Sequence, residues 1–356
     1  MSDARVRPSE RVQGLTARAT GRLPVWLQLR LSGRPQIVID EQTLDPQVQL
    51  LLAIHRKRRP YGLCHPSPAE ARARFRRDTL ATAVTKTSVG AVRELEIPGV
   101  DGCLRARHYA PPAADRCPDL LVYLHGGGFV LGDLDTHDEP CRLLCRHADT
   151  HVLSIDYRLA PEHPFPAALN DALAALRWAQ GNAATLGAQR SRVALGGDSA
   201  GGNLTAVAAQ FAARGGYPPV AQLLIYPAID AMTATASKEM FGDGFFLDRQ
   251  DCDDFLHYYT DGTGVSDDDP RVSPLRATDF SGLPPALVVT AGFDVLRDEG
   301  EAYAAALREA GTIVLPRRFP ALGHGFIHMT GISHAAHHAT IEVARDWRAL
   351  LDSTSS

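Results

Sequence analysis

A serine lies between small residues at 197–201, Gly-Asp-Ser-Ala-Gly. The apolar run 192–196 before it predicts a buried strand, and the alanine-rich run 202–211 after it predicts a helix. A G-x-S-x-G sequence at such a junction forces a sharp turn, which exposes the serine oxygen beside the positive end of the helix. Ser199 is therefore a candidate nucleophile, provided that the other parts of a catalytic site follow in the right order.

A second candidate feature is the glycine run Gly126-Gly127-Gly128, which follows His125 and the predicted strand 119–124. Without side chains, the amide groups of such a run can point into a cavity and bind the negative charge that acyl transfer places on a carbonyl oxygen. A flexible loop or a phosphate cradle is the alternative. A phosphate cradle would have Lys and Ser or Thr after the glycines, where this chain has Phe129 and Val130. The run fits an oxyanion-binding loop better.

Three acids compete for the role of an orienting carboxylate after the apolar strand 286–291. Asp294 is nearest to the end of the strand, whereas Asp298 and Glu299 fall in the first turn of the next predicted helix. Acids in a first turn often only complement the helix dipole. An acid at the carboxyl end of a strand can hold a histidine, so Asp294 is favoured.

The candidate base is His324, which lies between Gly323 and Gly325 in a loop after the predicted strand 312–318. In such a loop an imidazole can take the serine proton and later return it. The competing histidines are His328, His334, His337 and His338. The last three have helical spacing, but no carboxylate or cysteine partner that would complete a ligand set is evident, so no metal site is predicted.

The chain order is glycine loop, Ser199, Asp294 and His324, which is the order in α/β-hydrolases. Such a set would hydrolyse an ester in two steps through an acyl-enzyme, without a cofactor or metal. The triad does not choose among acyl donors, so an amidase, peptidase or lactonase is an alternative. A non-catalytic small-molecule receptor of the same fold is a second alternative, although a receptor is expected to lose a triad member and this chain has all three.

Alternating strand and helix patterns must position these residues. Segments 91–97 and 102–109 resemble an antiparallel pair, and continuous apolar runs such as 120–124 predict buried parallel strands. Further strands are expected at 119–124, 152–156, 192–197, 220–226, 286–291 and 312–318, and helices near 136–148, 166–180, 200–213, 297–310 and 338–351. Before this region, helices are predicted from Pro46 and from a capping box at Ser67.

Composition excludes several function classes. The 356-residue chain has a net charge of −4 and no apolar run long enough to span a membrane. Its basic N-terminal part lacks the interleaved aromatic residues of a nucleic-acid binder, and the six cysteines are scattered. No secretion signal is evident, so a cytoplasmic protein with reduced thiols is expected.

Several motifs resemble those of the hormone-sensitive-lipase family of α/β-hydrolases, the bacterial carboxylesterases. The matching segments are 125–128 (HGGG), 157–162 (YRLAPE), 197–201 (GDSAG), 294–299 (DVLRDE) and 324–326 (HGF). The resemblance covers about residues 90 to 350 and implies an α/β fold with an eight-stranded, mostly parallel sheet, flanking helices and a helical cap. It also implies an oxyanion hole made by the amides of Gly127, Gly128 and Ala200, and short or medium acyl chains in the substrate.

The predicted domain organisation follows from this resemblance. It comprises a leader of unknown role (1–35), an N-terminal part of the cap (36–90), a core (91–230), a cap insertion (231–275) and a second core segment (276–356). Asp248 is the expected N-cap of a helix in the insertion. Phe245, Phe246 and Leu247 are the expected walls of an acyl pocket, because a lid with few charges excludes water. The expected ligand is a small-molecule ester, and a homodimer is one option for the assembly.

Overall fold

The computed structural model describes residues 23–58, 62–82, 86–114 and 117–354. An eight-stranded sheet with the strand order β10-β9-β8-β7-β5-β6-β4-β3 forms its centre. The strands are β3 (Ala91–Gly99), β4 (Gly102–Ala110), β5 (Leu120–Leu124), β6 (His151–Asp156), β7 (Val193–Asp198), β8 (Gln222–Ile225), β9 (Ala286–Phe293) and β10 (Val314–Gly323). The six strands from β10 to β6 are parallel, and β4 and β3 are antiparallel to their neighbours. The predicted mostly parallel sheet is confirmed.

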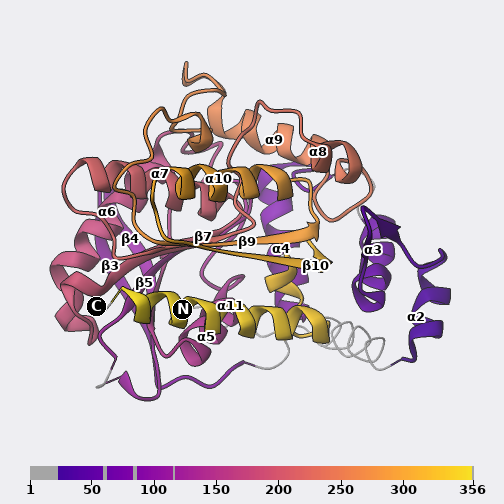
Figure 1. The fold of residues 1–356 in the computed structure, drawn as a ribbon, viewed down its shortest axis with the longest axis horizontal. Coiled ribbons are helices and arrows are strands. Elements are labelled where there is room, and N and C mark those ends of the chain that lie inside the picture. Colours follow the sequence, from indigo (N-terminus) through magenta and orange to yellow (C-terminus); the bar gives the residue numbers. More distant parts are fainter. Residues whose placement is uncertain (1–22, 59–61, 83–85, 115–116, 355–356) are drawn as a thin grey trace.

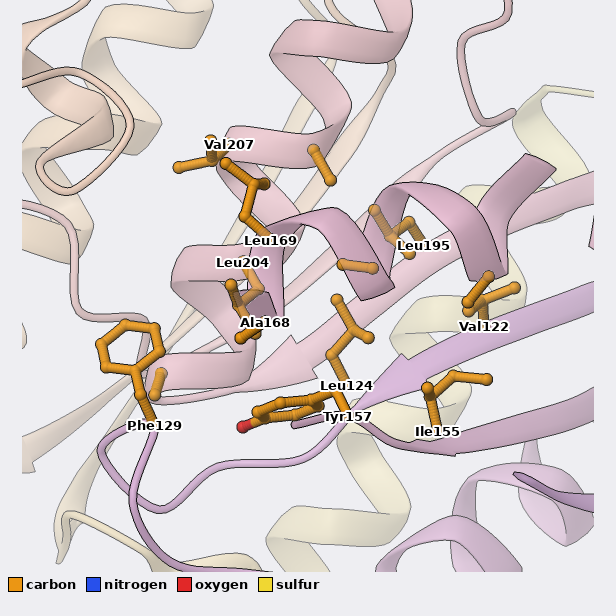
Figure 2. Packing of buried hydrophobic residues seen from close by; sticks show 14 of the residues in the cluster. Val122, Leu124, Phe129, Ile155, Tyr157, Ala168, Leu169, Leu195, Leu204 and Val207 are labelled. Carbon is orange, nitrogen blue, oxygen red and sulfur yellow. The ribbon is translucent and has the colours of Figure 1, made fainter. Parts of the chain in front are cut away.

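Helices cover both faces of the sheet, as the apolar strands require. In Figure 1, α6, α7 and α10 lie on one side of the strands, and α5 and α11 lie on the other. Their bounds are α5 (Asp138–His147), α6 (Ala167–Asn182), α7 (Ala200–Arg214), α10 (Arg297–Glu309) and α11 (His334–Ser353). Figure 2 shows Leu169 of α6 and Leu204 of α7 above strand residues such as Leu124. Short 3-10 helices are η2 (Ala183–Leu186), η3 (Arg190–Arg192), η4 (Pro274–Arg276) and η5 (Phe326–Met329).

Two predicted bounds differ from the structure by four residues or more. Strand β10 continues to Gly323 instead of ending at 318, because Gly323 still pairs with Phe293 of β9 after an irregularity. Helix α11 begins at His334 instead of 338, because the Ser333 side chain accepts the amide hydrogen of Ala336 and caps the helix there. The first correction matters for function, since it brings the residue before His324 onto the sheet edge.

Among the described residues, four α-helices come from the two segments predicted to form a cap. They are α3 (Pro46–Arg58), α4 (Pro68–Thr82), α8 (Ala236–Phe241) and α9 (Arg249–Thr260). Asp248 is the N-cap of α9, as predicted, and its amide donates to the Asp251 carboxylate at 3.1 Å. Asp251 also accepts the amide hydrogen of Leu63 at 2.6 Å, which joins the two segments directly.

The N-terminal end contains elements that the sequence pattern did not predict. Residues 1–22 of the expected leader lie outside the described residues, but α2 (Val25–Ser32) lies inside it, followed by β1 (Val38–Ile39) and β2 (Gln42–Thr43). The buried Gln49 side chain of α3 holds this segment through Ser32 Oγ (3.0 Å), the Pro35 carbonyl (2.9 Å) and the Ile37 amide (2.9 Å). A tertiary contact, rather than an apolar stripe, therefore fixes it.

Within the described ranges, none of the helices combines the length and the hydropathy that a membrane crossing requires.

Candidate active site

Three of the predicted residues come together at one edge of the sheet. Ser199 follows β7, Asp294 follows β9, and Gly323 of β10 precedes His324. Parallel strands present their carboxyl ends at the same edge, so residues far apart in sequence meet there.

The three side chains form a continuous hydrogen-bonded chain. His324 Nε2 lies 3.1 Å from Ser199 Oγ, and His324 Nδ1 lies 2.9 Å from Asp294 Oδ2. The other carboxylate oxygen of Asp294 accepts the amide hydrogen of Leu296 at 2.9 Å, which fixes the carboxylate plane. Asp294 is fully buried, whereas the His324 side chain is 12% exposed, so the base can reach a bound molecule while its partner stays out of water.

Ser199 adopts the strained turn that its motif predicted. Its backbone angles are φ 54° and ψ −118°, outside the regions that L-residues favour. The Ser199 amide donates to the Ile225 carbonyl of β8 at 2.9 Å and holds the turn. A Cβ atom at Gly197 or Gly201 would overlap the Leu124 carbonyl oxygen, so only glycine lets α7 come this close to β5.

The glycine loop presents free amide groups beside Ser199. Within the described part of the chain, the amides of Gly127 and Gly128 donate to no protein acceptor. Ala200 is the first residue of α7, where a helix leaves its amide groups unpaired. Gly128 has φ +62°, and a Cβ atom there would overlap the ring of Phe255. All three residues line the same cavity as Ser199 and His324.

Asp198 connects the serine turn to the glycine loop. Its Oδ1 accepts the amide hydrogen of Gly126 at 2.8 Å and the hydroxyl hydrogen of Tyr123 at 2.7 Å. Complete burial works against ionisation, but His137 and His328 outweigh it and hold the pKa of this carboxyl well below its usual range. Asp198 is therefore an anion directly behind Ser199. Its neighbours come from distant segments, so the sequence alone indicated no role for it.

The two competing acids serve other contacts. The Asp298 carboxylate accepts from the Arg297 side chain and the Ser237 amide. Glu299 is buried against Lys238 Nζ at 2.8 Å and accepts the Ile229 amide hydrogen. Of the three candidates, only Asp294 contacts His324.

The competing histidines also lie apart from Ser199 and Asp294. His334, His337 and His338 lie on α11, where no group of potential metal ligands forms among the described residues. His328 lies instead beside Asp198, with its Nε2 3.8 Å from Asp198 Oδ2.

A cavity of about 760 Å³ opens over the triad. Both predicted cap segments contribute to its wall, for example through Phe75 of α4 and Leu256 of α9. Phe246 and Leu247 also line it, and the Phe246 ring contacts His55 at a centroid distance of 5.5 Å.

Phe245 lies outside this cavity, in contrast to the sequence-based expectation. Its ring packs on Phe241 and Phe293, with centroid distances of 5.2 Å and 5.9 Å. Consecutive residues of an irregular segment point in different directions, so one neighbour faces the cavity and the other faces the core.

An arginine of α4 holds the end of the glycine loop. Arg72 of α4 donates from Nε to the Val130 carbonyl and from Nη2 to the Ala160 carbonyl, both at 2.7 Å, and pairs with Glu162. The YRLAPE motif thus contributes structural ion pairs, Glu162 with Arg72 and Arg158 with Asp171. Arg72 could not be identified from the sequence because its partners are far away along the chain.

Comparison with known proteins agrees with the fold. The family described as "alpha/beta hydrolase fold" matches residues 121–328. The chain is 46% identical over 354 residues to the carboxylic ester hydrolase LipN of Mycobacterium tuberculosis, covering 96% of this chain and 94% of that protein. It is 43% identical over 279 residues to the carboxylesterase NlhH of the same species, covering 76% and 85%. Among solved structures, an ester hydrolase from the metagenome of Lake Arreo matches with a TM-score of 0.82 and 39% identity, covering 86% and 98%.

The chain belongs to the α/β-hydrolase family. The predicted resemblance to its hormone-sensitive-lipase branch of carboxylesterases is confirmed.

Proposed function

We propose that this protein is a serine carboxylesterase in which Ser199 is the nucleophile, His324 the base and Asp294 the orienting acid. The observation that carries the proposal is the hydrogen-bonded chain from Ser199 Oγ through His324 to Asp294. Its Ser199 end faces a cavity that Gly127, Gly128 and Ala200 also line. Relatives at 43–46% identity are named as carboxylic ester hydrolases, which supports ester hydrolysis as the reaction.

The geometry supports a two-step reaction. His324 Nε2 takes the Ser199 proton as Oγ attacks the ester carbonyl, and the imidazolium that forms is stabilised by Asp294. The oxygen of the tetrahedral intermediate accepts from the amides of Gly127, Gly128 and Ala200. His324 then gives the proton to the departing alcohol. A water that His324 deprotonates next attacks the acyl-enzyme, and the acid leaves with Ser199 restored.

The proposed substrates are esters of short to medium acyl chains. A cavity of about 760 Å³ is in the size range of small-molecule sites. Its wall combines Phe246 and Leu247 from the insertion with Phe75 from the N-terminal helices, which supports the division into a core (91–230 and 276–356) and a cap (36–90 and 231–275). Phe245 is no longer part of the proposed acyl pocket.

Matched kinetics test the proposal. Purified protein is assayed with p-nitrophenyl esters of increasing acyl length and with the corresponding anilides. Rapid ester turnover that disappears in Ser199→Ala is expected, with much slower anilide turnover. Faster turnover of the anilides would favour the amidase alternative, and unchanged ester turnover in Ser199→Ala would refute the nucleophile.

A cytoplasmic location is also proposed, and all six cysteines are free thiols, as a reducing compartment allows. A homodimer stays a prediction, which light scattering on the purified protein tests.

A further inference from the structure

A group of three potential metal ligands lies behind the serine turn. His137, Asp198 and His328 each offer one ligand atom, and these atoms lie within 4.8 Å of one another. His137 Nε2 is 3.4 Å from Asp198 Oδ1, and His328 Nε2 is 3.8 Å from Asp198 Oδ2. None of the acyl-transfer steps uses either histidine.

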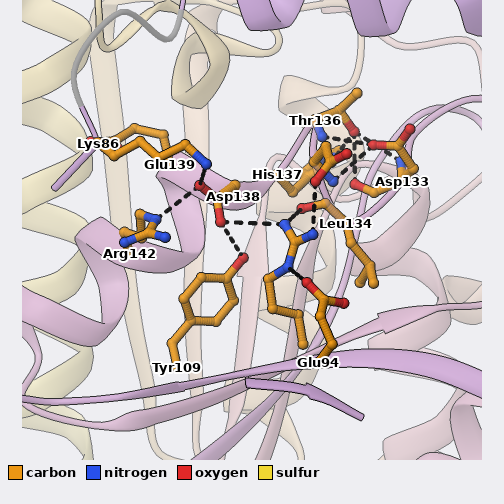
Figure 3. Close-up of polar contacts among 12 residues, drawn as sticks. Lys86, Glu94, Tyr109, Asp133, Leu134, Thr136, His137, Asp138, Glu139 and Arg142 are labelled. Atoms are coloured by element: carbon orange, nitrogen blue, oxygen red, sulfur yellow. Dashed lines mark hydrogen bonds and ion pairs between the residues drawn. The ribbon is translucent and has the colours of Figure 1, made fainter. Parts of the chain in front are cut away.

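The hydrogen bonds of Thr136 determine the tautomer of His137. Thr136 Oγ1 donates to the Asp133 carbonyl and accepts the Asp133 amide hydrogen, both at 2.8 Å (Figure 3). Its only hydrogen is thereby used, so the contact of 2.9 Å with His137 Nδ1 is a hydrogen bond that the imidazole donates. Neutral His137 then has no hydrogen on Nε2.

The bare Nε2 of His137 faces a carboxylate. The side chain of His137 is completely buried, and within the described residues this nitrogen makes no hydrogen bond. A nitrogen lone pair and the Asp198 carboxylate repel each other at 3.4 Å unless a positive group lies between them. A proton or a metal ion would satisfy both atoms.

His328 supplies the third donor and faces the cavity. Its ring lies edge-on to that of His137, with a centroid distance of 4.5 Å and an interplanar angle of 84°. Asp198 and His328 both line the large cavity. Three protein ligands would leave the fourth position of a tetrahedral ion for a water molecule.

We propose that His137, Asp198 and His328 bind a divalent transition-metal ion of the Zn²⁺ type. Two imidazoles and one carboxylate suit such an ion, and bonds of about 2.0–2.1 Å in a tetrahedron place ligand atoms about 3.3 Å apart. The two measured separations run to different carboxylate oxygens, 3.4 Å from His137 to Asp198 Oδ1 and 3.8 Å from His328 to Asp198 Oδ2. The three ligand atoms lie within 4.8 Å of one another, so the partly exposed His328 has to move inward to enclose an ion.

The Thr136 hydroxyl acts as an outer partner that fixes the ligating tautomer of His137. The ion takes no part in acyl transfer. Its effect on hydrolysis rests on the proposed function. A bound ion would compete with the Gly126 amide for the Asp198 carboxylate, so metal binding is expected to lower kcat.

Metal binding is measured first, independently of catalysis. The full-length protein is stripped with a chelator and titrated calorimetrically with Zn²⁺, and Co²⁺ is added separately to record its visible absorption. We expect one equivalent of Zn²⁺ to bind with a micromolar Kd. Co²⁺ should give the visible absorption spectrum of a tetrahedral site. His328→Gln should weaken Zn²⁺ binding at least tenfold and abolish the Co²⁺ bands, while its melting temperature stays close to that of the parent.

The double variant His334→Gln/His338→Gln is the control for adventitious binding on α11, and it should retain the site. No stoichiometric binding by the parent protein would overturn the proposal, as would unchanged binding in His328→Gln or loss of binding in the control. In those cases a shared proton joins His137 to Asp198. If Zn²⁺ binds as expected but esters are not hydrolysed, the metal site stands and the proposed function fails.

Discussion

The carboxylate of Asp198 accepts the amide hydrogen of Gly126 at 2.8 Å, so the residue before Ser199 is bonded to the first glycine of the loop opposite. A Cβ atom on Gly126 would overlap this carboxylate, which shows how closely the two segments approach. The nucleophile and the proposed oxyanion donors are thereby held by one buried hydrogen bond. Asp198 is a positioning residue in this arrangement.

Replacing Asp198 with alanine is expected to lower kcat by about 10-fold to 10²-fold with little change in KM. The loss should be smaller than that of an oxyanion donor, because Asp198 only positions the loop that carries the donors. Asp198→Asn keeps an acceptor for the Gly126 amide and should lose much less. Steady-state kinetics and thermal melts of both variants measure this. A rise in KM at unchanged kcat would contradict a positioning role.

Asp294→Asn is expected to reduce kcat by about 10⁴-fold, because an asparagine stabilises the wrong His324 tautomer. Asp298→Asn is the matched control, since Asp298 pairs with Arg297 and does not reach His324. Ester hydrolysis by both purified variants gives the comparison. Equal losses of kcat in the two variants would contradict an orienting role for Asp294.

Gly127→Ala should lower kcat by about 10²–10³-fold, the usual effect of losing an oxyanion donor. Gly127 has φ +121°, and a Cβ atom there would overlap the Leu131 backbone, so the loop must move. Gly181→Ala is the control, because a Cβ atom on Gly181 meets nothing within 4 Å. The amides of the loop would have no catalytic role if both variants kept parental kcat.

Phe246→Ala should shift the preferred acyl length of p-nitrophenyl esters to longer chains, because the ring occupies the cavity wall. Phe245→Ala should leave the acyl preference unchanged and lower the unfolding free energy by at most about 3 kcal/mol, since its half-buried ring packs against the core. Kinetic profiles and denaturant titrations separate the two effects. An unchanged profile in Phe246→Ala would remove this residue from the acyl pocket.

A buried histidine pair should make the stability depend on pH. Arg93 donates to His108 Nδ1 at 3.1 Å, and His108 Nε2 lies 3.1 Å from His151 Nδ1. Burial, then the His151 and Arg93 charges, lowers the pKa of His108 from 6.5 to about 3. Below pH 6.5 the unfolded chain takes up a proton that the folded chain refuses, so stability falls as the pH drops.

The slope for this one group is up to about 1.4 kcal/mol per pH unit, from pH 6.5 down towards pH 3. His108→Gln cannot take up the proton and should show a flatter decline of the unfolding free energy between pH 6.5 and pH 4. Denaturant titrations at several pH values measure it, with His338→Gln as the reference. Parallel curves for parent and His108→Gln would contradict this origin.

Local patterns in the sequence were sufficient to predict the sheet and to favour Asp294 over the two competing acids. Apolar runs such as 120–124 predict buried parallel strands, and Ser199 and Asp294 each follow such a run, whereas His324 follows the partly exposed strand β10. Local patterns were not sufficient for irregular segments. Phe245 and Phe246 are chemically identical neighbours, and their directions depend on packing against Phe293 and His55.

The sequence by itself determined the fold class, the nucleophile turn and the order of the catalytic residues, because strand periodicity, glycine geometry and chain order are local properties. Only the tertiary structure decided which acid reaches His324, which phenylalanine faces the cavity, and that His137 and His328 meet at Asp198. Those relationships join residues from separate strands and loops. Their distances depend on how the whole chain packs, which no local pattern encodes.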